Sequence, residues 1–109
     1  MVRSGSAFYG EKMKEKVYEF LRTIPKGKVV TYGQIAEHLG NKRLSRAVGN
    51  ILHSNPDKDK YPCYKVVDRN GKLSEHYAFG GIEKQKELLE KDGVEVNNYK
   101  VDLGKYGMR

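Results

Sequence analysis

Cysteine and long apolar runs are what this sequence most lacks. Cys63 is the only cysteine among 109 residues, which excludes an internal disulfide and a zinc site of ordinary cysteine spacing. No apolar run approaches the roughly 20 residues of a membrane-spanning helix, and the N-terminus has no apolar segment of a secretory signal. We therefore expect a cytoplasmic protein with no membrane partner and no metal site, in which one thiol needs an explanation.

Acidic residues are few beside basic ones. The 14 Asp and Glu residues against 21 Lys and Arg give a formal net charge of +7, a balance that favours a polyanionic partner such as nucleic acid. A chain this short buries only about two-thirds of the surface that its unfolded form exposes, so it has room for one modest core. We expect one domain over residues 1–109 that acts as a monomer.

Helical signals fill the first half of the chain. Apolar residues at helical spacing predict a first helix from about Tyr9 to Thr23. Thr31 and Gln34 form the signature of a capping box, so a second helix begins after Thr31 and ends at Gly40. A third is predicted from Leu44 to about His53. Its polar face carries small residues and arginines, namely Arg43, Arg46, Ala47 and Asn50. Two short helices around such a turn are typical of a helix-turn-helix, with an ordinary helical hairpin as the alternative.

The second half predicts a small β element and one more helix. Residues 61–67 are typical of a short strand, and Asn70-Gly71 is the turn signal of a β-hairpin. A loop over 74–81 leads to a helix from about Ile82 to Lys91. Residues 94–101 are expected to be extended and residues 104–109 loosely held. The predicted fold class is mostly α with a short β-hairpin.

Six short motifs follow one another along the chain, and their order and spacing are specific. They are Thr31-Tyr32-Gly33-Gln34-Ile35-Ala36, Arg46-Ala47-Val48-Gly49, Asn55-Pro56, Pro62-Cys63-Tyr64-Lys65-Val66-Val67, Gly80-Gly81-Ile82 and Leu88-Leu89-Glu90-Lys91-Asp92-Gly93. Over about residues 8–94 they resemble the C-terminal domain of the O6-alkylguanine-DNA alkyltransferases, a family that includes the short alkyltransferase-like proteins. The resemblance implies a winged helix-turn-helix-like fold and, as partner, double-stranded DNA containing O6-alkylguanine.

The resemblance also implies how DNA is bound. Arg46 matches the residue that fills the place of a nucleotide rotated out of the duplex, a rotation that requires a few kcal/mol of unstacking. Tyr32 matches the tyrosine beside the rotated nucleotide, which donates a proton to the purine. Ala47 and Gly49 match small residues that let the helix approach the groove. The remaining implied DNA contacts are Arg43, Asn50 and Asn55, and Asn55 also ties the recognition helix to the cysteine strand.

Cys63 matches the residue that accepts the alkyl group. A thiolate attacks the alkyl carbon directly, so each molecule acts once and no cofactor is needed. The implied substrate pocket consists of Pro62, Cys63, Val66, Tyr77, Phe79 and Gly80. Without the resemblance, a lone cysteine is more often a small buried apolar residue.

One departure from the family lies directly after the cysteine. The family usually has histidine and arginine there, and that histidine, held by a glutamate, removes the thiol proton; this sequence has Tyr64 and Lys65, with Asp92 at the place of the glutamate. Cys63 and Lys65 would share one face of a strand, so Lys65 is a candidate to stabilise the thiolate. His76, in the loop before the last helix, is a candidate substitute base.

Three functions therefore compete. The first is a DNA-repair methyltransferase that acts once, with Cys63, Tyr32, Tyr64 and Asp92 as its catalytic residues. The second is an alkyltransferase-like sensor in which Cys63 is vestigial, so that the protein binds the lesion without transfer and hands it to other DNA-repair proteins. The loss of the histidine favours this second function. The third is a helix-turn-helix regulator with no lesion preference, for which the Pro62-Cys63 pair is coincidence.

Overall fold

The computed structural model describes residues 2–108, with side chains from Lys12 onward. Its elements, in chain order, are α1 (Val2–Leu21), β1 (Val30–Thr31), α2 (Tyr32–His38), the 3-10 turn η1 (Lys42–Leu44), α3 (Ser45–His53), the 3-10 turn η2 (Cys63–Lys65), β2 (Val66–Val67), α4 (Gly81–Lys91) and α5 (Leu103–Tyr106). The mostly α prediction is confirmed. None of the described helices is long and apolar enough to cross a membrane.

The helix-turn-helix forms as predicted. Thr31 caps α2 by accepting the backbone N–H of Gln34, and the Gln34 side chain accepts the N–H of Thr31 in return. After η1, α3 packs against α2 through its apolar face, which is buried at Val48, Ile51 and Leu52. The opposite face of α3 is left to solvent.

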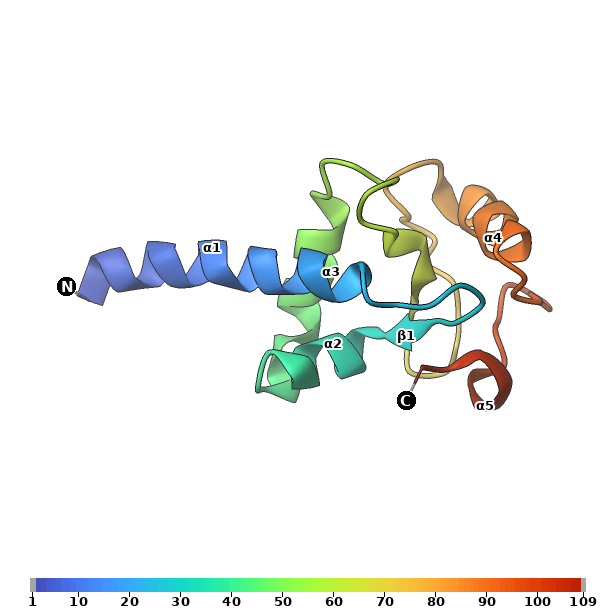
Figure 1. Cartoon of the computed structure of the whole chain (residues 1–109), viewed down its shortest axis with the longest axis horizontal. Helices are drawn as coiled ribbons and strands as arrows, with labels where there is room; N and C mark the ends of the chain where they lie inside the picture. The colour runs from blue at the N-terminus through green and yellow to red at the C-terminus, as the bar shows by residue number, and fades with distance from the viewer. Residues whose placement is uncertain (1, 109) are drawn as a thin grey trace.

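Helix α1 begins at Val2, before the predicted Tyr9, and ends at Leu21, two residues before the predicted Thr23. Its C-terminal half packs on the helix-turn-helix (Figure 1), and Val17 and Leu21 are fully buried. The Tyr18 hydroxyl donates to the carbonyl of Ile51 at 2.9 Å. This bond ties α1 to the C-terminal turn of α3.

The predicted β-hairpin is wrong, because the two short strands run parallel. Val30 pairs with Val66 and Thr31 with Val67, and η2 occupies the first half of the predicted strand. The turn at Asn70-Gly71 does form, with the Gly71 N–H donating to Asp68. The chain beyond that turn bridges Lys100 through Lys72 instead of returning along β2. Both faces of the strand pair are covered, which is the usual setting of parallel strands.

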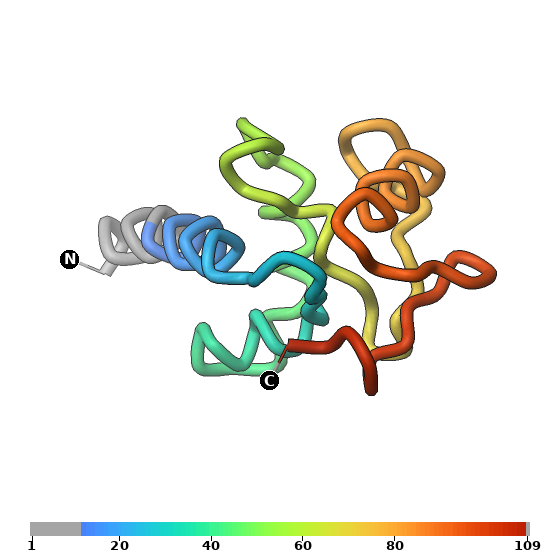
Figure 2. The backbone as a smooth tube through the Cα atoms, turned by 45° about the vertical axis from the view of Figure 1, so that its right-hand side comes forward, coloured from blue at the N-terminus to red at the C-terminus, as the bar shows by residue number. Residues whose placement is uncertain are grey.

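The strand pair lies between two apolar clusters. Figure 2 shows the backbone of the two regions that form them, with α1, α2 and α3 on one side and α4 on the other. Val30 and Val66 face the cluster built on α1, α2 and α3. Val29 and Val67 face a second cluster formed with α4 and the C-terminal segment. Successive strand residues point to opposite faces. Each of the two neighbouring valine pairs, Val29-Val30 and Val66-Val67, therefore contributes one side chain to each cluster.

The C-terminal segment is held firmly to the rest of the chain. Val29 accepts the N–H of Met108 at 2.8 Å and donates its own N–H to Tyr106 at 2.9 Å. The Gln34 side chain also donates to the carbonyl of Met108, at 2.7 Å. The expectation that residues 104–109 are loosely held is therefore wrong for residues 104–108, and Arg109 lies outside the described residues.

Candidate base pocket and nucleic-acid interface

Cys63 begins η2, and its thiol is almost fully buried, with 5% of the residue exposed. The Cys63 N–H donates to the carbonyl of Tyr61 at 2.7 Å, and the same carbonyl accepts Nδ2 of Asn55 at 2.7 Å. Asn55 is itself buried, and its Oδ1 accepts the N–H of Asp57. Asn55 therefore joins the chain just after α3 to the turn that carries the cysteine.

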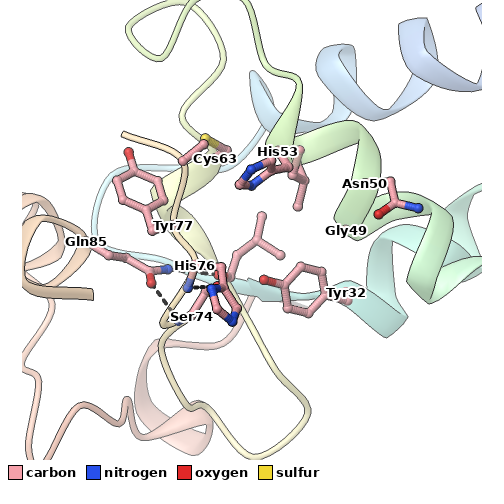
Figure 3. Close-up of a pocket in the computed structure, with 12 residues that line it drawn as sticks. Tyr32, Gly49, Asn50, His53, Cys63, Ser74, His76, Tyr77 and Gln85 are labelled. Atoms are coloured by element: carbon pink, nitrogen blue, oxygen red, sulfur yellow. Dashed lines mark hydrogen bonds between the residues drawn. The ribbon is translucent and has the colours of Figure 1, made fainter. Parts of the chain in front are cut away.

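A cavity of about 260 Å³ opens between α3 and the loop before α4 (Figure 3). Cys63 lies at one end and Tyr32 at the other. The lining residues are Tyr32, Gly49, Asn50, Leu52, His53, Cys63, Val66, Ser74, His76, Tyr77, Ala78 and Gln85. Helical, strand and loop residues thus meet around a space that reaches the thiol from the side of α3.

The structure brings part of the predicted site together at the cavity. Of the predicted pocket residues, Cys63, Val66 and Tyr77 line the cavity, together with the predicted DNA-binding residues Tyr32, Gly49 and Asn50. Outside the lining lie Pro62, Phe79 and Gly80. Phe79 packs edge-on against the Tyr77 ring, with ring centroids 5.9 Å apart, and Gly80 precedes α4 with φ of 122°.

Five lining residues were missed from the sequence, and Gln85 and His53 are two of them. Gln85 is 1% exposed; its Nε2 donates to the carbonyls of Tyr64 and Val66 at 3.0 Å, and its Oε1 accepts the N–H of Ser74. Gln85 therefore fixes the cavity floor to the loop above it. His53 lies three residues after Asn50 on α3, so helical spacing would have placed both on one face.

The ionisable groups of the cavity are shifted by burial. Desolvation raises the pKa of the Cys63 thiol, while the hydrogen-bond donors of Asn55, the Cys63 backbone and Tyr77, which favour the thiolate, lower it in part. Desolvation also raises the pKa of Tyr32. The pKa of Tyr77 is raised strongly, first by burial and then by its proximity to Cys63. All three groups are protonated at neutral pH.

Lys65 and Asp92 form a buried pair away from the cavity. Nζ of Lys65 lies 3.2 Å from Oδ2 of Asp92 and donates to the carbonyls of Ile24 and Pro25, while Asp92 also accepts the N–H of Gly27 at 2.8 Å. The expectation that Lys65 shares a face with the cysteine is wrong, because a 3-10 turn rotates residues i and i+2 away from each other.

Tyr64 points toward this same pair. After desolvation, the Asp92 carboxylate raises the pKa of the half-buried Tyr64 hydroxyl. Neither Tyr64 nor Asp92 is part of the cavity lining. Asp92 also caps the C-terminal end of α4, so it joins the α1–β1 loop to α4.

The predicted DNA-binding face of α3 is open. Arg43, Arg46 and Asn50 are exposed, and Ala47 and Gly49 are half-buried. A Cβ added at Gly49 would meet none of the described residues within 4 Å, so packing among those residues does not require glycine there. A basic face with small residues beside the cavity suits close approach of an anionic partner.

Comparisons with known proteins agree with this arrangement. Residues 12–94 match the sequence model of the 6-O-methylguanine DNA methyltransferase DNA-binding domain. The methylated-DNA–protein-cysteine methyltransferase of Shigella flexneri is 43% identical over 84 residues, which are 77% of this chain and 48% of that enzyme. The chain thus spans about half the length of this curated relative.

A shorter relative is matched over most of its length. Alkyltransferase-like protein 1 of Schizosaccharomyces pombe is 36% identical over 91 residues, 84% of this chain and 82% of that protein. The crystal structure of S. pombe Atl1 in complex with damaged DNA containing O6-carboxymethylguanine superposes with a TM-score of 0.83 at 32% identity, covering 91% of this chain and 96% of that one. This chain belongs to the family of the 6-O-methylguanine DNA methyltransferase DNA-binding domain.

Proposed function

We propose that this protein binds duplex DNA through the exposed face of α3, takes an O6-alkylated guanine into the cavity, and transfers the alkyl group slowly to Cys63. One observation carries the proposal. Cys63 lies at the end of a cavity that opens beside the helix carrying Arg46, so a base rotated out of a duplex lying on α3 would bring its O6 side toward the thiol.

The transfer step is a direct displacement. The Cys63 thiolate forms a bond to the alkyl carbon, the bond from that carbon to O6 breaks, and the electron pair stays on O6 of the guanine. The departing guanine then takes up a proton. Tyr32 lines the cavity and its raised pKa keeps its hydroxyl protonated, which suits a proton donor.

Slowness follows from the state of the thiol. Burial raises the pKa of Cys63, so the thiolate is a small fraction at neutral pH. His53 and His76 line the cavity with Cys63, and both are candidates to accept its proton through water. In this proposal, His53 from α3 or His76 from the loop before α4 takes the role of the histidine that is missing after the cysteine.

The second candidate function is a lesion sensor that binds O6-alkylguanine without transfer and hands it to other DNA-repair proteins. The same raised pKa of Cys63 favours it. So does the similarity to an alkyltransferase-like protein over 82% of that protein's length. The two candidates share the DNA face and the cavity and differ only in the fate of the alkyl group.

Mass spectrometry of the Cys63 peptide separates the two candidates. The protein is incubated with duplexes carrying either O6-methylguanine or guanine, at pH 7 and pH 8.5, and the Cys63 peptide is weighed after digestion. A methyl adduct on Cys63 that is absent in Cys63→Ala supports transfer. An unmodified peptide, with the lesion duplex still bound in preference to the guanine duplex, leaves the sensor. Equal affinity for the two duplexes would contradict both.

A further inference from the structure

Tyr77 carries a buried polar atom without an explanation. The residue is 8% exposed, and its hydroxyl is inaccessible and has no hydrogen-bond partner among the described residues. An unpaired buried hydroxyl destabilises the folded state, and in native proteins such a group often has a role in another state of the site.

The hydroxyl lies at the thiol end of the cavity. Tyr77 and Cys63 both line it, and the hydroxyl end of the Tyr77 ring points toward the side where the sulfur lies (Figure 3). Edge-on packing against Phe79 holds the ring from behind. The two groups also interact electrostatically, because Cys63 has the largest effect on the pKa of Tyr77 after burial.

We propose that the Tyr77 hydroxyl is a hydrogen-bond donor reserved for the thiolate of Cys63, and that it makes the cysteine ionisable where the family's neighbouring histidine is replaced by Tyr64. A neutral thiol is a weak acceptor, whereas a thiolate is a strong one. The hydroxyl is therefore unpaired while Cys63 is protonated and becomes paired when Cys63 loses its proton. The unpaired Tyr77 hydroxyl is thus explained by the thiolate form of Cys63, which is the form that the displacement reaction needs.

The donor belongs to a small set around the sulfur. Asn55 has two amide hydrogens, of which one is used on the carbonyl of Tyr61, and hydrogen bonding from Asn55 also lowers the thiol pKa. The titratable groups that interact electrostatically with Cys63 are Tyr18 from α1, Tyr32 from α2 and Tyr77 from the loop before α4. His53 from α3 and His76 from the same loop also line the cavity. Two neutral donors, Asn55 and Tyr77, thus oppose the desolvation of the thiolate.

This role deepens the proposed transfer function, for which it supplies the nucleophile. Tyr77 is a positioning residue, since its hydroxyl acts on Cys63 and not on the DNA. The thiol can be titrated without DNA, which separates the two proposals. The pseudo-first-order rate of Cys63 alkylation by iodoacetamide, followed from pH 6.5 to 10.5, gives the midpoint of thiol ionisation in the free protein.

Tyr77→Phe should move this midpoint upward by about one unit, so that alkylation below the midpoint is about tenfold slower at a fixed pH. Tyr18→Phe is the matched control, because it removes a tyrosine hydroxyl that faces the same thiol but already donates to Ile51. The control should lower the thermal unfolding midpoint and leave the thiol midpoint unmoved. Tyr77→Phe should instead move the thiol midpoint and leave the thermal unfolding midpoint unlowered, since its hydroxyl has no hydrogen-bond partner to lose.

Equal thiol midpoints in the wild type and Tyr77→Phe would overturn the inference, as would equal shifts in the two variants. If Tyr77→Phe does not fold, the wild type provides the test. The 13C resonance of the Tyr77 ring carbon that bears the hydroxyl should shift with the midpoint of the Cys63 titration, and no shift at that midpoint would overturn the inference. A moved midpoint together with no alkyl transfer from DNA would contradict the transfer proposal alone.

Discussion

At the scale of single residues, Cys63 meets two opposed requirements. In the proposed transfer, burial at the end of a cavity would exclude water from the reacting centre, and the same burial disfavours the thiolate that would attack. In the family the neighbouring histidine resolves this conflict; here Tyr64 lies toward Asp92 instead. The balance between desolvation and the donors Asn55 and Tyr77 therefore decides how much thiolate is present.

The first prediction concerns pH. Because the pKa of Cys63 is raised above its usual value, the thiolate fraction at pH 7 to 8 lies far below one half and increases about tenfold per pH unit. We expect the single-turnover rate of methyl transfer to increase by that factor from pH 7 to pH 8, measured by the Cys63 adduct over time. A rate that is flat over this range would mean that the thiol is already ionised when DNA is bound.

The second prediction restores the missing histidine. Tyr64→His places an imidazole where the tyrosine ring now lies near Asp92. If it reaches the thiol through water, the transfer rate near pH 7 should increase several-fold, with little change at pH 9, where the thiol ionises more readily by itself. Tyr64→Phe is the control and should show no increase. An unchanged rate in Tyr64→His at pH 7 would show that Asp92, held by Lys65 and Gly27, cannot orient the ring.

Sequence reasoning at the residue level succeeded where a motif determines a position. The cavity brings Tyr32 together with Cys63 as the motif order implied. It failed for Gln85, whose hydrogen-bond partners are distant in sequence, and it overlooked His53, which the helical spacing from Asn50 would have indicated. It also failed for Lys65, because a strand was assumed where a 3-10 turn forms and the side chain then reaches Asp92.

At the scale of elements, α3 is expected to contact the DNA groove and to keep the rotated nucleotide out of the base stack. Arg46 is exposed on α3 beside the cavity lining residues Gly49 and Asn50. The third prediction is that Arg46→Ala lowers the ratio of affinities for lesion and normal duplex about tenfold, since the guanidinium replaces lost stacking. Fluorescence anisotropy with matched duplexes measures the ratio.

The control for this prediction is Arg22→Ala, which removes the same charge from an exposed position after α1, where Arg22 pairs with Glu19. Both variants should weaken general DNA affinity at low salt, because each removes one positive charge. Only Arg46→Ala should change the lesion ratio. If both variants lower the ratio of lesion to normal affinity equally, Arg46 contributes only its positive charge.

Elements differ in how far their sequence determines them. The capping box of Thr31 and Gln34 is local, and its prediction is confirmed. The partner of a strand is not local: β2 pairs with β1 across more than thirty residues, whereas the Asn70-Gly71 signal indicated a neighbouring strand. The turn formed, but the partner was determined by burial of Val66 and Val67 on opposite faces.

The fourth prediction concerns the pair that joins two elements. Lys65 and Asp92 have side chains only 6% and 13% exposed, and removing one partner of such a pair leaves a buried charge, at about 3–5 kcal/mol. Asp92→Ala should therefore lower the free energy of unfolding in urea by about 3 kcal/mol. Glu90→Ala, which breaks the exposed pair of α4 with Lys86, should change it by less than about 1 kcal/mol. Similar losses would mean that the buried pair is no stronger than a surface one.

At the scale of the whole molecule, the cavity depends on both apolar clusters. The helix-turn-helix and Cys63 belong to the first cluster, while the second packs α4 and the C-terminal segment against the other face of the strand pair. Gln85, on α4, fixes the cavity floor. The shape of the pocket therefore depends on where α4 lies, and packing in the second cluster holds α4 in place.

The last prediction tests this dependence. The family match ends at residue 94, yet Val96 and Val101 are buried in the second cluster at 7% and 2% exposure. Burying a valine stabilises by about 1.5–3 kcal/mol, so a chain ending at Val94 should lose about 3–6 kcal/mol in all. Folded proteins have only about 5–15 kcal/mol of stability. We expect the shortened chain to be largely unfolded or to melt at a much lower temperature.

A chain ending at Tyr106 is the matched comparison. It keeps Val96 and Val101 and loses mainly the bonds of Met108 to Val29 and Gln34, each of which contributes about 1 kcal/mol. Urea unfolding should therefore rank the full chain above the chain ending at Tyr106, and that chain well above the one ending at Val94. Lesion-duplex binding should follow the same order, because α4 holds the cavity floor through Gln85. If the free energy of unfolding of the chain ending at Val94 lies within about 1 kcal/mol of that of the full chain, the second cluster contributes little, and the shape of the pocket must rest on the helix-turn-helix cluster alone.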